Sequence, residues 1–267
     1  MSLLPRPSGS GRGFVLRAWP TGETSVVVAV LVDGVGLLRL LAKGAREQHS
    51  QLRPLVQPGR LADLEFSLDP ARELQYLRGG TVLLDPLAVS PTLERSVYLL
   101  AALEIIDCCR PGHGHETGLF TLCEAYVEVL SCADPGREAA LYYAFEIALL
   151  ELLGVRPELE ICTHCGARRA QAADGVAWLS PAAGGLVCGG CVDAGVEGGG
   201  AAVTRRLTPA DLAAWPELAA APRIWPVQPL AREAARNWGV MLHRFLEYHL
   251  PGYRLPASLA LLRGQPR

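Results

Sequence analysis

The sequence lacks any long apolar run. Its 267 residues contain no stretch near the roughly 18–20 uncharged residues that a membrane-spanning helix needs. The N-terminal segment has arginines but no apolar run of about 7–15 residues behind them, so it does not resemble a secretory signal. We therefore expect a cytoplasmic protein, a setting in which eight cysteines are more often thiols or metal ligands than disulfides.

Motifs of covalent and phosphoryl-transfer catalysis are also missing. There is no G-x-S-x-G elbow, no H-E-x-x-H and no G-x-x-x-x-G-K-[ST] loop. His243 and His249 have no acidic or cysteine partner at a useful spacing, and Glu124 with Glu128 is most simply a solvated helix face. The glycines within residues 9–13 precede an expected strand, so we interpret them as a flexible tail. We expect a protein that is not an enzyme; a site assembled from scattered residues is the alternative.

Lysine is almost absent, since Lys43 is the only one among 25 basic residues. This bias toward arginine reflects genome composition rather than function. The net charge of −2 nevertheless hides an asymmetry, because residues 1–62 hold eight basic and three acidic side chains. The remaining residues hold 17 basic and 24 acidic ones. Such a split suggests a polyanion-facing N-terminal part joined to a part with another role, and random fluctuation is the alternative.

Short runs rich in Val and Leu, separated by turn residues, occupy roughly the first 80 positions. They lie at residues 14–19, 25–32, 35–41, 60–68 and 73–78. The dipeptide Asp33-Gly34 predicts a hairpin between the second and third runs, because this turn needs positive φ and glycine accepts it. Five short strands in a compact unit predict a small barrel, either of the OB type or SH3-like.

From about residue 90 the apolar period becomes helical. Capping and stop signals predict helices at residues 93–109, 116–132, 137–153, a short one after residue 208, and 230–250. Residues 155–200 lie between these helices, so we interpret them as a projection from one helical bundle.

Two C-x-x-C pairs form the strongest chemical signal. Cys162 and Cys165 are followed, after 22 residues, by Cys188 and Cys191. Each pair turns the chain so that both sulfurs face one ion, and four thiolates close the tetrahedron around zinc without a position for activated water. The pattern predicts one structural Zn²⁺ in a zinc-finger-like module. Two disulfides, or redox-active pairs, are the alternatives.

The residues around these pairs carry further expectations. His164 sits between two predicted ligands and should face solvent. Tight geometry in the two turns is expected to need three glycines, at positions 166, 189 and 190. The other cysteines lie in expected helices, where a free thiol is usually a core residue: Cys108, Cys109, Cys123 and Cys132.

Together these segments predict an α+β multidomain fold. An OB-type DNA-binding barrel is expected at residues 1–82 and a four-cysteine zinc module at 156–200. The helical domain is expected in two parts, at 83–155 and 201–267, with the zinc module inserted between them.

Several motifs resemble those of the bacterial RecO family of recombination mediators. The N-terminal ones are a strand, a turn, a Gly-centred hairpin and a basic segment: Val15-Leu16-Arg17, Gly22-Glu23, residues 33–36 and Lys43-Gly44-Ala45-Arg46. Residues 154–167 and 184–191 resemble the zinc module that many members carry after their third helix. The resemblance covers nearly the whole chain in order: barrel, helices, C-x-x-C pairs and helices.

The resemblance implies a DNA repair protein of the RecF pathway, associated with the bacterial nucleoid. It implies binding of single- and double-stranded DNA through the barrel and annealing of complementary strands. It also implies action with RecR to help load RecA onto single-stranded DNA coated by single-strand-binding protein (SSB). An apolar groove in the helical part could take the acidic, hydrophobic SSB tail, as in some relatives.

A basic barrel offers contacts to DNA phosphates without reading bases. We expect these contacts from four residues around the hairpin and the loop after it: Arg39, Lys43, Arg46 and Arg53. Weaker candidates for a DNA or partner contact flank the zinc module: Arg168, Arg169, Arg205 and Arg206. A zinc-containing RNA- or polymerase-binding factor with an OB-like barrel is the alternative, and it would prefer RNA and lack annealing activity.

Overall fold

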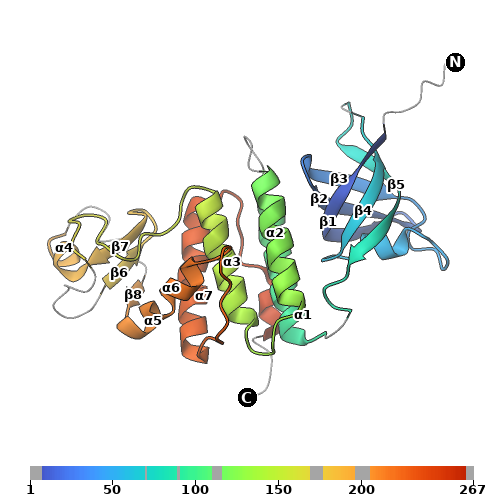
Figure 1. Ribbon diagram of the computed structural model, residues 1–267. Helices are drawn as coiled ribbons and strands as arrows, with labels where there is room; N and C mark the ends of the chain where they lie inside the picture. The colour runs from blue at the N-terminus through green and yellow to red at the C-terminus, as the bar shows by residue number, and fades with distance from the viewer. Residues whose placement is uncertain are drawn as a thin grey trace. The chain divides into compact units, whose positions relative to one another are not determined.

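The computed structural model describes residues 8–69, 71–88, 91–109, 116–168, 177–195 and 205–262. Contacts divide the chain into two compact units, seen in Figure 1. Unit 1 comprises Met1–Ser131 and Pro256–Arg267, and unit 2 comprises Cys132–Leu255. The four-domain division made from the sequence stays a prediction. Across the described ranges, no helix combines the length and the apolar character needed to cross a membrane.

Five strands of unit 1 close into a barrel with the order β1-β2-β3-β5-β4. Their bounds are β1 Ser8–Thr21, β2 Ser25–Val32, β3 Gly36–Ala42, β4 Leu61–Ser67 and β5 Leu74–Leu84. Neighbouring strands are antiparallel, except that β3 runs parallel to β5. This closed arrangement confirms the α+β prediction in its first part, an OB-type barrel.

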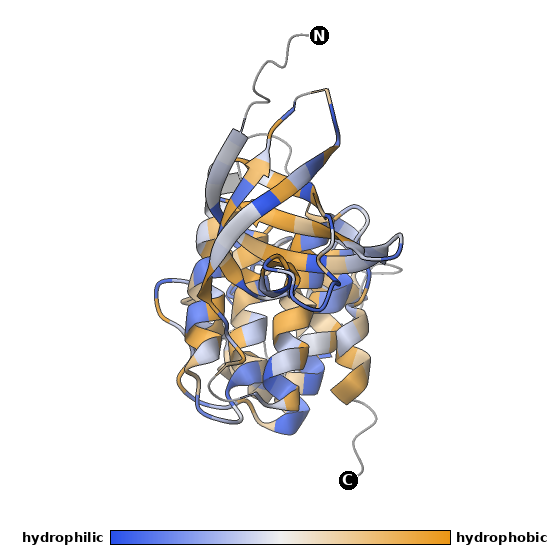
Figure 2. Ribbon diagram, turned by 90° about the vertical axis from the view of Figure 1, so that its right-hand side faces the viewer, coloured by the Kyte–Doolittle hydropathy of each residue, from blue (hydrophilic) through white to orange (hydrophobic). Residues whose placement is uncertain are grey.

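Strand β2 illustrates why the barrel closes. Its valines at 26, 28, 30 and 32 belong to the buried core of the barrel, together with Leu40 and Phe66. Alternate residues of a strand point to opposite faces, so the positions between these valines face outward. Figure 2 shows long hydrophobic stretches on the barrel strands, interrupted in places by hydrophilic residues. Burial of the inner set drives closure. Of the outer positions of β2, Ala29 and Leu31 are buried as well, and Val27 is half-buried.

Strand β1 is longer than predicted, because its glycine-rich start is part of the strand and not a flexible tail. Gly9 pairs with Phe66 of β4, and the pairing continues through Gly13. A Cβ atom would lie 2.7 Å from the Phe66 ring at Gly9, and 2.8 Å from Val30 at Gly13. The glycines therefore let β1 lie close against the core. The tail interpretation was wrong because it considered these residues without a partner strand.

Unit 1 also contains α1 (Leu93–Cys108), α2 (Glu116–Ser131) and the 3-10 helix η3 (Ala257–Leu262). Thr92 caps α1 by accepting a hydrogen bond from the backbone N–H of Arg95, at 3.0 Å. The carboxylate of Glu104 in α1 accepts hydrogen bonds from the backbone N–H groups of Ala257 and Ser258. The C-terminal segment is thereby fastened to α1.

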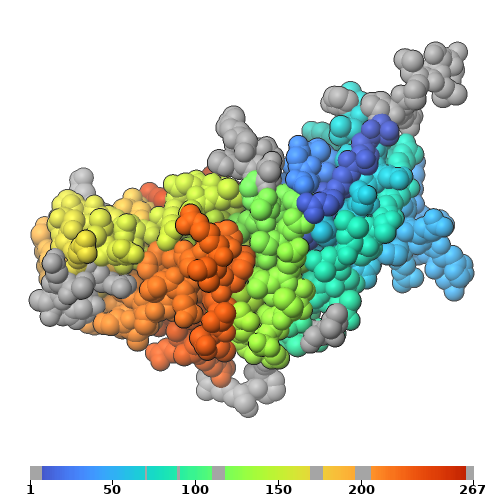
Figure 3. Space-filling model, in the orientation of Figure 1, coloured from blue at the N-terminus to red at the C-terminus, as the bar shows by residue number. Residues whose placement is uncertain are grey.

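Helix α2 packs beside the barrel, and Figure 3 shows its surface in contact with that of β1. The rings of Phe14 and Phe120 lie 5.4 Å apart between their centroids. The Arg12 guanidinium donates to Glu124 at 2.5 Å and to Asp33 at 3.3 Å. The prediction that Glu124 is simply solvated was wrong, because Glu124 forms an ion pair with Arg12. This partner lies 112 residues away in the sequence.

The described part of unit 2 contains further α-helices and a small sheet of order β7-β6-β8. The helices are α3 Glu138–Leu152, α4 Gly189–Asp193, α5 Pro209–Ala213, α6 Trp215–Ala219 and α7 Arg232–His249. The strands are β6 Ala177–Ser180, β7 Gly185–Cys188 and β8 Arg205–Leu207. Trp215 stacks on Trp238 at 5.9 Å, and the Trp238 indole N–H donates to the carbonyl of Asp211. This contact ties α5 and α6 to α7.

The four cysteines that were expected in helices differ in burial. Cys109 and Cys123 are buried, as predicted, and burial raises the pKa of the Cys109 thiol to about 12. Cys108 is only half-buried. Cys132 is exposed, so its assignment to the core was wrong. Helix α2 ends at Ser131, so Cys132 lies beyond the helical pattern on which that assignment depended.

One carboxylate is buried in unit 2. Glu146 of α3 has 3% of its surface exposed, and its Oε2 atom has no hydrogen-bond partner among the described residues. Burial raises the pKa of Glu146 from 4.5 to about 8, and the Tyr142 hydroxyl one turn earlier opposes the rise. The carboxyl is therefore neutral in the folded protein at neutral pH and ionised in the unfolded chain.

We predict that Glu146→Gln removes a pH dependence of folding. The Glu146 contribution to stability is complete below pH 4.5 and is lost as the pH rises toward about 8. Across that pH window, the free energy of unfolding of the variant should rise relative to that of the wild type by up to ~1.4 kcal/mol per pH unit. Urea unfolding at several pH values measures the difference, with Glu151→Gln on the same helix as the exposed control. If the free energies of unfolding of Glu146→Gln and wild type change in parallel with pH, Glu146 does not titrate as proposed.

Candidate nucleic-acid interface and metal centre

An aromatic and apolar row crosses the outside of the barrel on β1, β2, β3 and β5. Its members are register partners on successive strands: Trp19, Val27, Leu41 and Tyr76. All four are half-buried and none is covered completely. A β-bulge between Val15 and Arg17 sets this register, because it places Val15 in the core and leaves Arg17 exposed.

Two arginines lie over the ring of Trp19. The guanidinium carbons of Arg17 and Arg39 are 5.7 Å and 5.8 Å from its centroid. Both arginines are opposite Ala29 of the intervening strand, so they reach Trp19 from the same side of the sheet. Each such cation–π contact contributes about 0.5–1 kcal/mol when exposed. The arrangement holds two positive charges beside an accessible aromatic ring.

Tyr76 forms the second such centre. The Lys43 ammonium lies 5.0 Å from its ring centroid, and the Arg78 guanidinium lies 5.3 Å from it. Lys43 and Arg78 are exposed. We call the surface formed by the two centres the basic face: Arg17, Trp19, Arg39, Lys43, Tyr76 and Arg78.

The connection between β3 and β4 extends this surface. Arg46 and Arg53 are exposed there, and Arg53 begins the 3-10 helix η1 (Arg53–Val56). The backbone N–H of Arg46 donates to the carbonyl of Thr24 at 2.8 Å, which fixes the start of the connection against the β1–β2 turn. Both arginines line a pocket of about 360 Å³ that Trp19 also lines.

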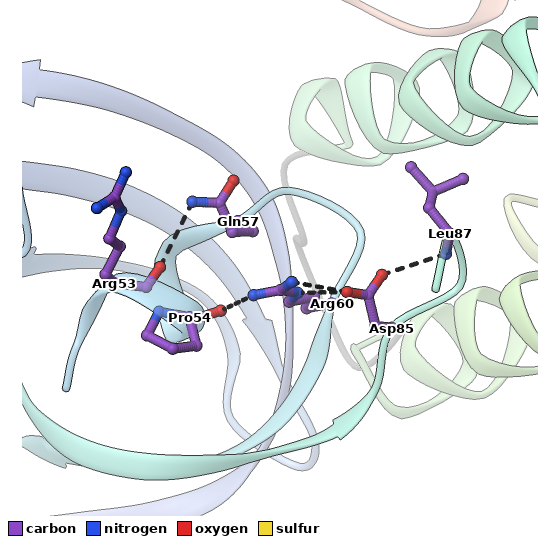
Figure 4. Close-up of polar contacts among 6 residues, drawn as sticks. All are labelled: Arg53, Pro54, Gln57, Arg60, Asp85 and Leu87. Atoms are coloured by element: carbon purple, nitrogen blue, oxygen red, sulfur yellow. Dashed lines mark hydrogen bonds and ion pairs between the residues drawn. The ribbon is translucent and has the colours of Figure 1, made fainter. Parts of the chain in front are cut away.

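Arg60 holds the end of this connection, as Figure 4 shows. Its guanidinium donates twice to Oδ2 of Asp85, at 2.9 Å and 2.7 Å, and once to the carbonyl of Pro54 at 2.8 Å. Asp85 also accepts from the backbone N–H of Leu87. Because one side chain bridges η1 and the end of β5, the loop that carries Arg53 is anchored at its base.

Charge is unevenly distributed around the barrel. Arg12 and Arg60 are paired with carboxylates. Within the described residues, no ion pair involves a cation of the basic face, Arg46 or Arg53. Exposed acidic side chains lie on β4, at Asp63 and Glu65, and in two turns near the basic face, at Glu23 and Glu47. The cations of the basic face therefore have acidic neighbours but no ion-pair partner among the described residues, so a polyanion can replace their counterions.

The structure brings the four predicted DNA contacts near one another along β3 and the connection after it. Sequence reasoning missed Arg17, Tyr76 and Arg78 of the basic face. The alternation of β1 and β5 could have pointed to them, but their approach to Lys43 and Arg39 depends on strand order, which the sequence alone does not show.

The weaker candidates have different outcomes. Arg168 and Arg206 are exposed in unit 2, and Arg206 lies on β8. Arg169 and the side chain of Arg205 lie outside the described residues. A contact role for any of them stays a prediction.

Four cysteine sulfurs meet at one end of unit 2. Cys162 and Cys165 come from a turn, Cys188 ends β7, and Cys191 lies in α4. Their Sγ atoms all lie within 4.8 Å of one another. Between the two C-x-x-C pairs, the Sγ atoms of Cys162 and Cys191 lie 4.0 Å apart and those of Cys165 and Cys188 lie 3.7 Å apart. A fold with an OB-type barrel, helices and a four-cysteine cluster was therefore predicted correctly.

Backbone hydrogen bonds assemble this cluster. The N–H of Thr163 donates to the carbonyl of Leu186 at 2.8 Å, which joins the first turn to β7. Gly185 permits a still closer approach, since a Cβ there would lie 2.3 Å from the carbonyl oxygen of Glu158. Gly166 has the expected positive φ of 73°, but Gly189 and Gly190 begin helix α4.

The sulfur spacing fits a single tetrahedral ion. Four thiolates at the usual Zn–S distance of about 2.3 Å lie about 3.8 Å apart, close to the distances found here. Disulfide bonds require about 2.05 Å, so the spacing does not fit two of them. His164 is exposed, as predicted.

The protonation of the cluster also favours a cation. Burial works against a Cys162 thiolate, but backbone N–H groups of Cys165, Cys188 and His164 outweigh it and lower the pKa of Cys162 to about 6. Burial, together with the neighbouring sulfurs, raises the pKa of Cys191 to about 12. The Cys162 thiolate is therefore stabilised, whereas burial and the nearby sulfurs oppose ionisation of Cys191. A bound cation would offset this opposition and allow all four cysteines to be thiolates.

Two histidines of α7 have structural contacts. His249 is 2.9 Å from the carbonyl of Pro181 in the β6–β7 turn, through its Nε2 atom. His243 lies 3.2 Å from the Tyr253 hydroxyl. The first contact connects the four-cysteine module to the last turn of α7.

These features define a multidomain protein built on an OB-type barrel, with a helical part and a four-cysteine module. The family model described as "Recombination protein O N terminal" matches residues 9–84, and "Recombination protein O C terminal" matches residues 90–258. The chain belongs to the RecO family of recombination and DNA repair proteins.

Relatives with the name DNA repair protein RecO match over most of the chain. The protein of Anaeromyxobacter dehalogenans strain 2CP-C is 32% identical over 250 residues, 92% of each chain. The protein of Synechococcus sp. strain JA-3-3Ab is 32% identical over 67% of this chain and 61% of its own. That of Chlorobium limicola is 25% identical over 61% of this chain and 62% of its own.

We predict that Asp85→Ala loosens the connection between β3 and β4. The change removes the two hydrogen bonds that Arg60 donates to the Asp85 carboxylate and leaves the one to the Pro54 carbonyl. We expect local stability there to fall by about 1 kcal/mol, since the pair is partly exposed. Amide hydrogen exchange at Leu55 and Val56 should become several-fold faster. Asp69→Ala, which removes the surface pair with Arg72, is the matched control. Unchanged exchange at Leu55 in Asp85→Ala would show that Arg60 does not anchor the loop.

Proposed function

We propose that this chain is a DNA repair and recombination mediator that binds single- and double-stranded DNA through the basic face. The observation that carries the proposal is the positive charge, without an ion-pair partner among the described residues, that is held against the half-buried rings of Trp19 and Tyr76. Arg46 and Arg53 extend the charge onto the neighbouring loop. Cations in this arrangement contact phosphates, and the two rings offer stacking surfaces to unpaired bases.

The same surface suits strand annealing. Phosphate contacts neutralise a strand without occupying the Watson–Crick edges of its bases. Two complementary strands that are held in this way repel each other less and remain able to pair. We propose that the chain anneals strands by this means and that it acts by binding, without catalysing a covalent step.

Family membership supports the finer steps of the proposal. We propose that the chain acts with RecR to help load RecA onto single-stranded DNA coated by SSB. The acidic excess outside residues 1–62 favours partner contacts rather than DNA contacts for the rest of the chain.

We further propose that Cys162, Cys165, Cys188 and Cys191 hold one structural zinc ion. The spacing of their sulfurs and the backbone donors around Cys162 support this assignment. The bound ion would supply cross-linking between the first turn, β7 and α4. Four thiolates leave no open coordination position, so the role is structural.

We predict that Lys43→Gln lowers the salt dependence of DNA binding. Each phosphate contact to single-stranded DNA contributes about −0.7 to the slope of log K against log salt concentration, so the slope should become shallower by about that amount. Fluorescence anisotropy across a salt series measures it. Arg156→Gln, which removes one charge that is paired with Glu151 in unit 2, is the matched control. Equal slopes for Lys43→Gln and wild type would place the phosphate contacts elsewhere.

We predict that the purified protein contains one zinc ion and that a chelator unfolds the four-cysteine module locally. The module has a buried cluster of only a few side chains, so the ion should supply much of its folding free energy. Elemental analysis and hydrogen exchange at Thr163 and Val187 measure the two effects. Exchange in the barrel core, for example at Val28, should stay slow. Global unfolding, or protein that binds no metal, would count against the structural role.

A further inference from the structure

A pocket beside the basic face has a chemistry of its own. Its volume is about 360 Å³, and none of its ten lining residues is acidic. The walls are mostly apolar, with contributions from Pro20, Val26 and Val56. Trp19 lines it as well, and two basic residues, Arg46 and Arg53, complete the lining. An apolar cavity lined by one aromatic residue and two basic residues suits a flat, apolar-faced group attached to anions.

A nucleotide of single-stranded DNA has this chemistry. Its base is a flat ring that stacks on aromatic side chains, and a phosphate lies on either side of it along the strand. In a duplex the bases are stacked and paired, so a base enters a pocket only after it leaves the stack, at a cost of a few kcal/mol. The same pocket would therefore be open to a single strand and closed to a duplex.

Continuity with the basic face favours this occupant over another acidic one. Trp19 belongs to the pocket wall and also to the row that leads across the barrel to Tyr76. A DNA single strand that follows this row therefore reaches the pocket while it stays in contact with the cations of the basic face. A short acidic peptide with an apolar end would match the pocket but would leave the rest of the row uncovered.

We propose that this pocket binds one unstacked nucleobase of single-stranded DNA, with the base against Trp19 and its flanking phosphates on Arg46 and Arg53. The inference rests on the proposed function, DNA binding by the barrel, and adds to it a site that discriminates single strands from duplexes. Arg60 and Asp85 contribute indirectly, because they hold the loop that forms one wall.

The variant Gln57→Trp tests the pocket itself. Gln57 is exposed and lines the pocket, so an indole at this position can occupy the cavity without replacing a core residue. Affinity for a thymine oligonucleotide should fall about tenfold, a loss within the range measured for one stacked base. Affinity for a duplex of the same length should change by less than about twofold. Arg39→Gln on the basic face is the matched control, and it should lower the affinity for both the oligonucleotide and the duplex.

An oligonucleotide that lacks its bases gives a second measurement, on the wild-type protein. The wild type should bind the intact oligonucleotide about tenfold more tightly than this abasic strand, and Gln57→Trp should lose most of that preference. Thermal unfolding and zinc content of the variant establish that it is folded. If Gln57→Trp does not fold, the intact and abasic strands are compared on the wild type and on Trp19→Leu. Trp19→Leu should then lose most of the preference for the intact strand.

Three results would overturn the inference. One is an equal loss of single-strand and duplex affinity in Gln57→Trp. Another is wild-type protein that binds the abasic strand as tightly as the intact one. The third is an acidic peptide with an aromatic end that binds the wild type but not Gln57→Trp, while oligonucleotide affinity is the same in both. Wild-type protein that binds no DNA at all would instead overturn the proposed function.

Discussion

Closure of the barrel is the constraint on which the DNA-binding surface depends. Five strands share one core, so each strand has a fixed inner face and a fixed outer face. The bulge after Val15 adjusts β1 so that Arg17 and Trp19 join the outer row. The parallel pairing of β3 with β5 then places Tyr76 beside Leu41, within reach of Lys43. A one-residue slip of either strand would direct these side chains into the core and bury uncompensated charge.

The four-cysteine module follows a different physical rule. Its buried cluster contains Cys162, Val187 and Cys191 and little else, so hydrophobic burial contributes a small part of its stability. Sulfur geometry, backbone hydrogen bonds and the contact of His249 with Pro181 position it against α7. Burial of apolar area therefore organises the barrel, whereas coordination would organise the module.

Local patterns in the sequence were enough to predict the strands, most of the helices and the cysteine cluster. Alternating valines and the C-x-x-C spacing depend on neighbours only a few residues apart. Apart from Cys132, which lies just past a helix end, the errors arose where a partner is distant in sequence. Gly9 belongs to a strand because it pairs with Phe66, and Glu124 is occupied because Arg12 reaches it. Tyr76 joins the basic face for the same reason, through strand order rather than local composition.

Hydrogen exchange of the full chain, measured with and without a single-stranded oligonucleotide, shows whether DNA binds to the basic face. We expect protection along β1, β3 and β5 around Trp19 and Tyr76, and in the connection that carries Arg46 and Arg53. We expect little change on β4, where Asp63 and Glu65 are exposed. Protection confined to unit 2, with the barrel unchanged, would contradict binding at the basic face.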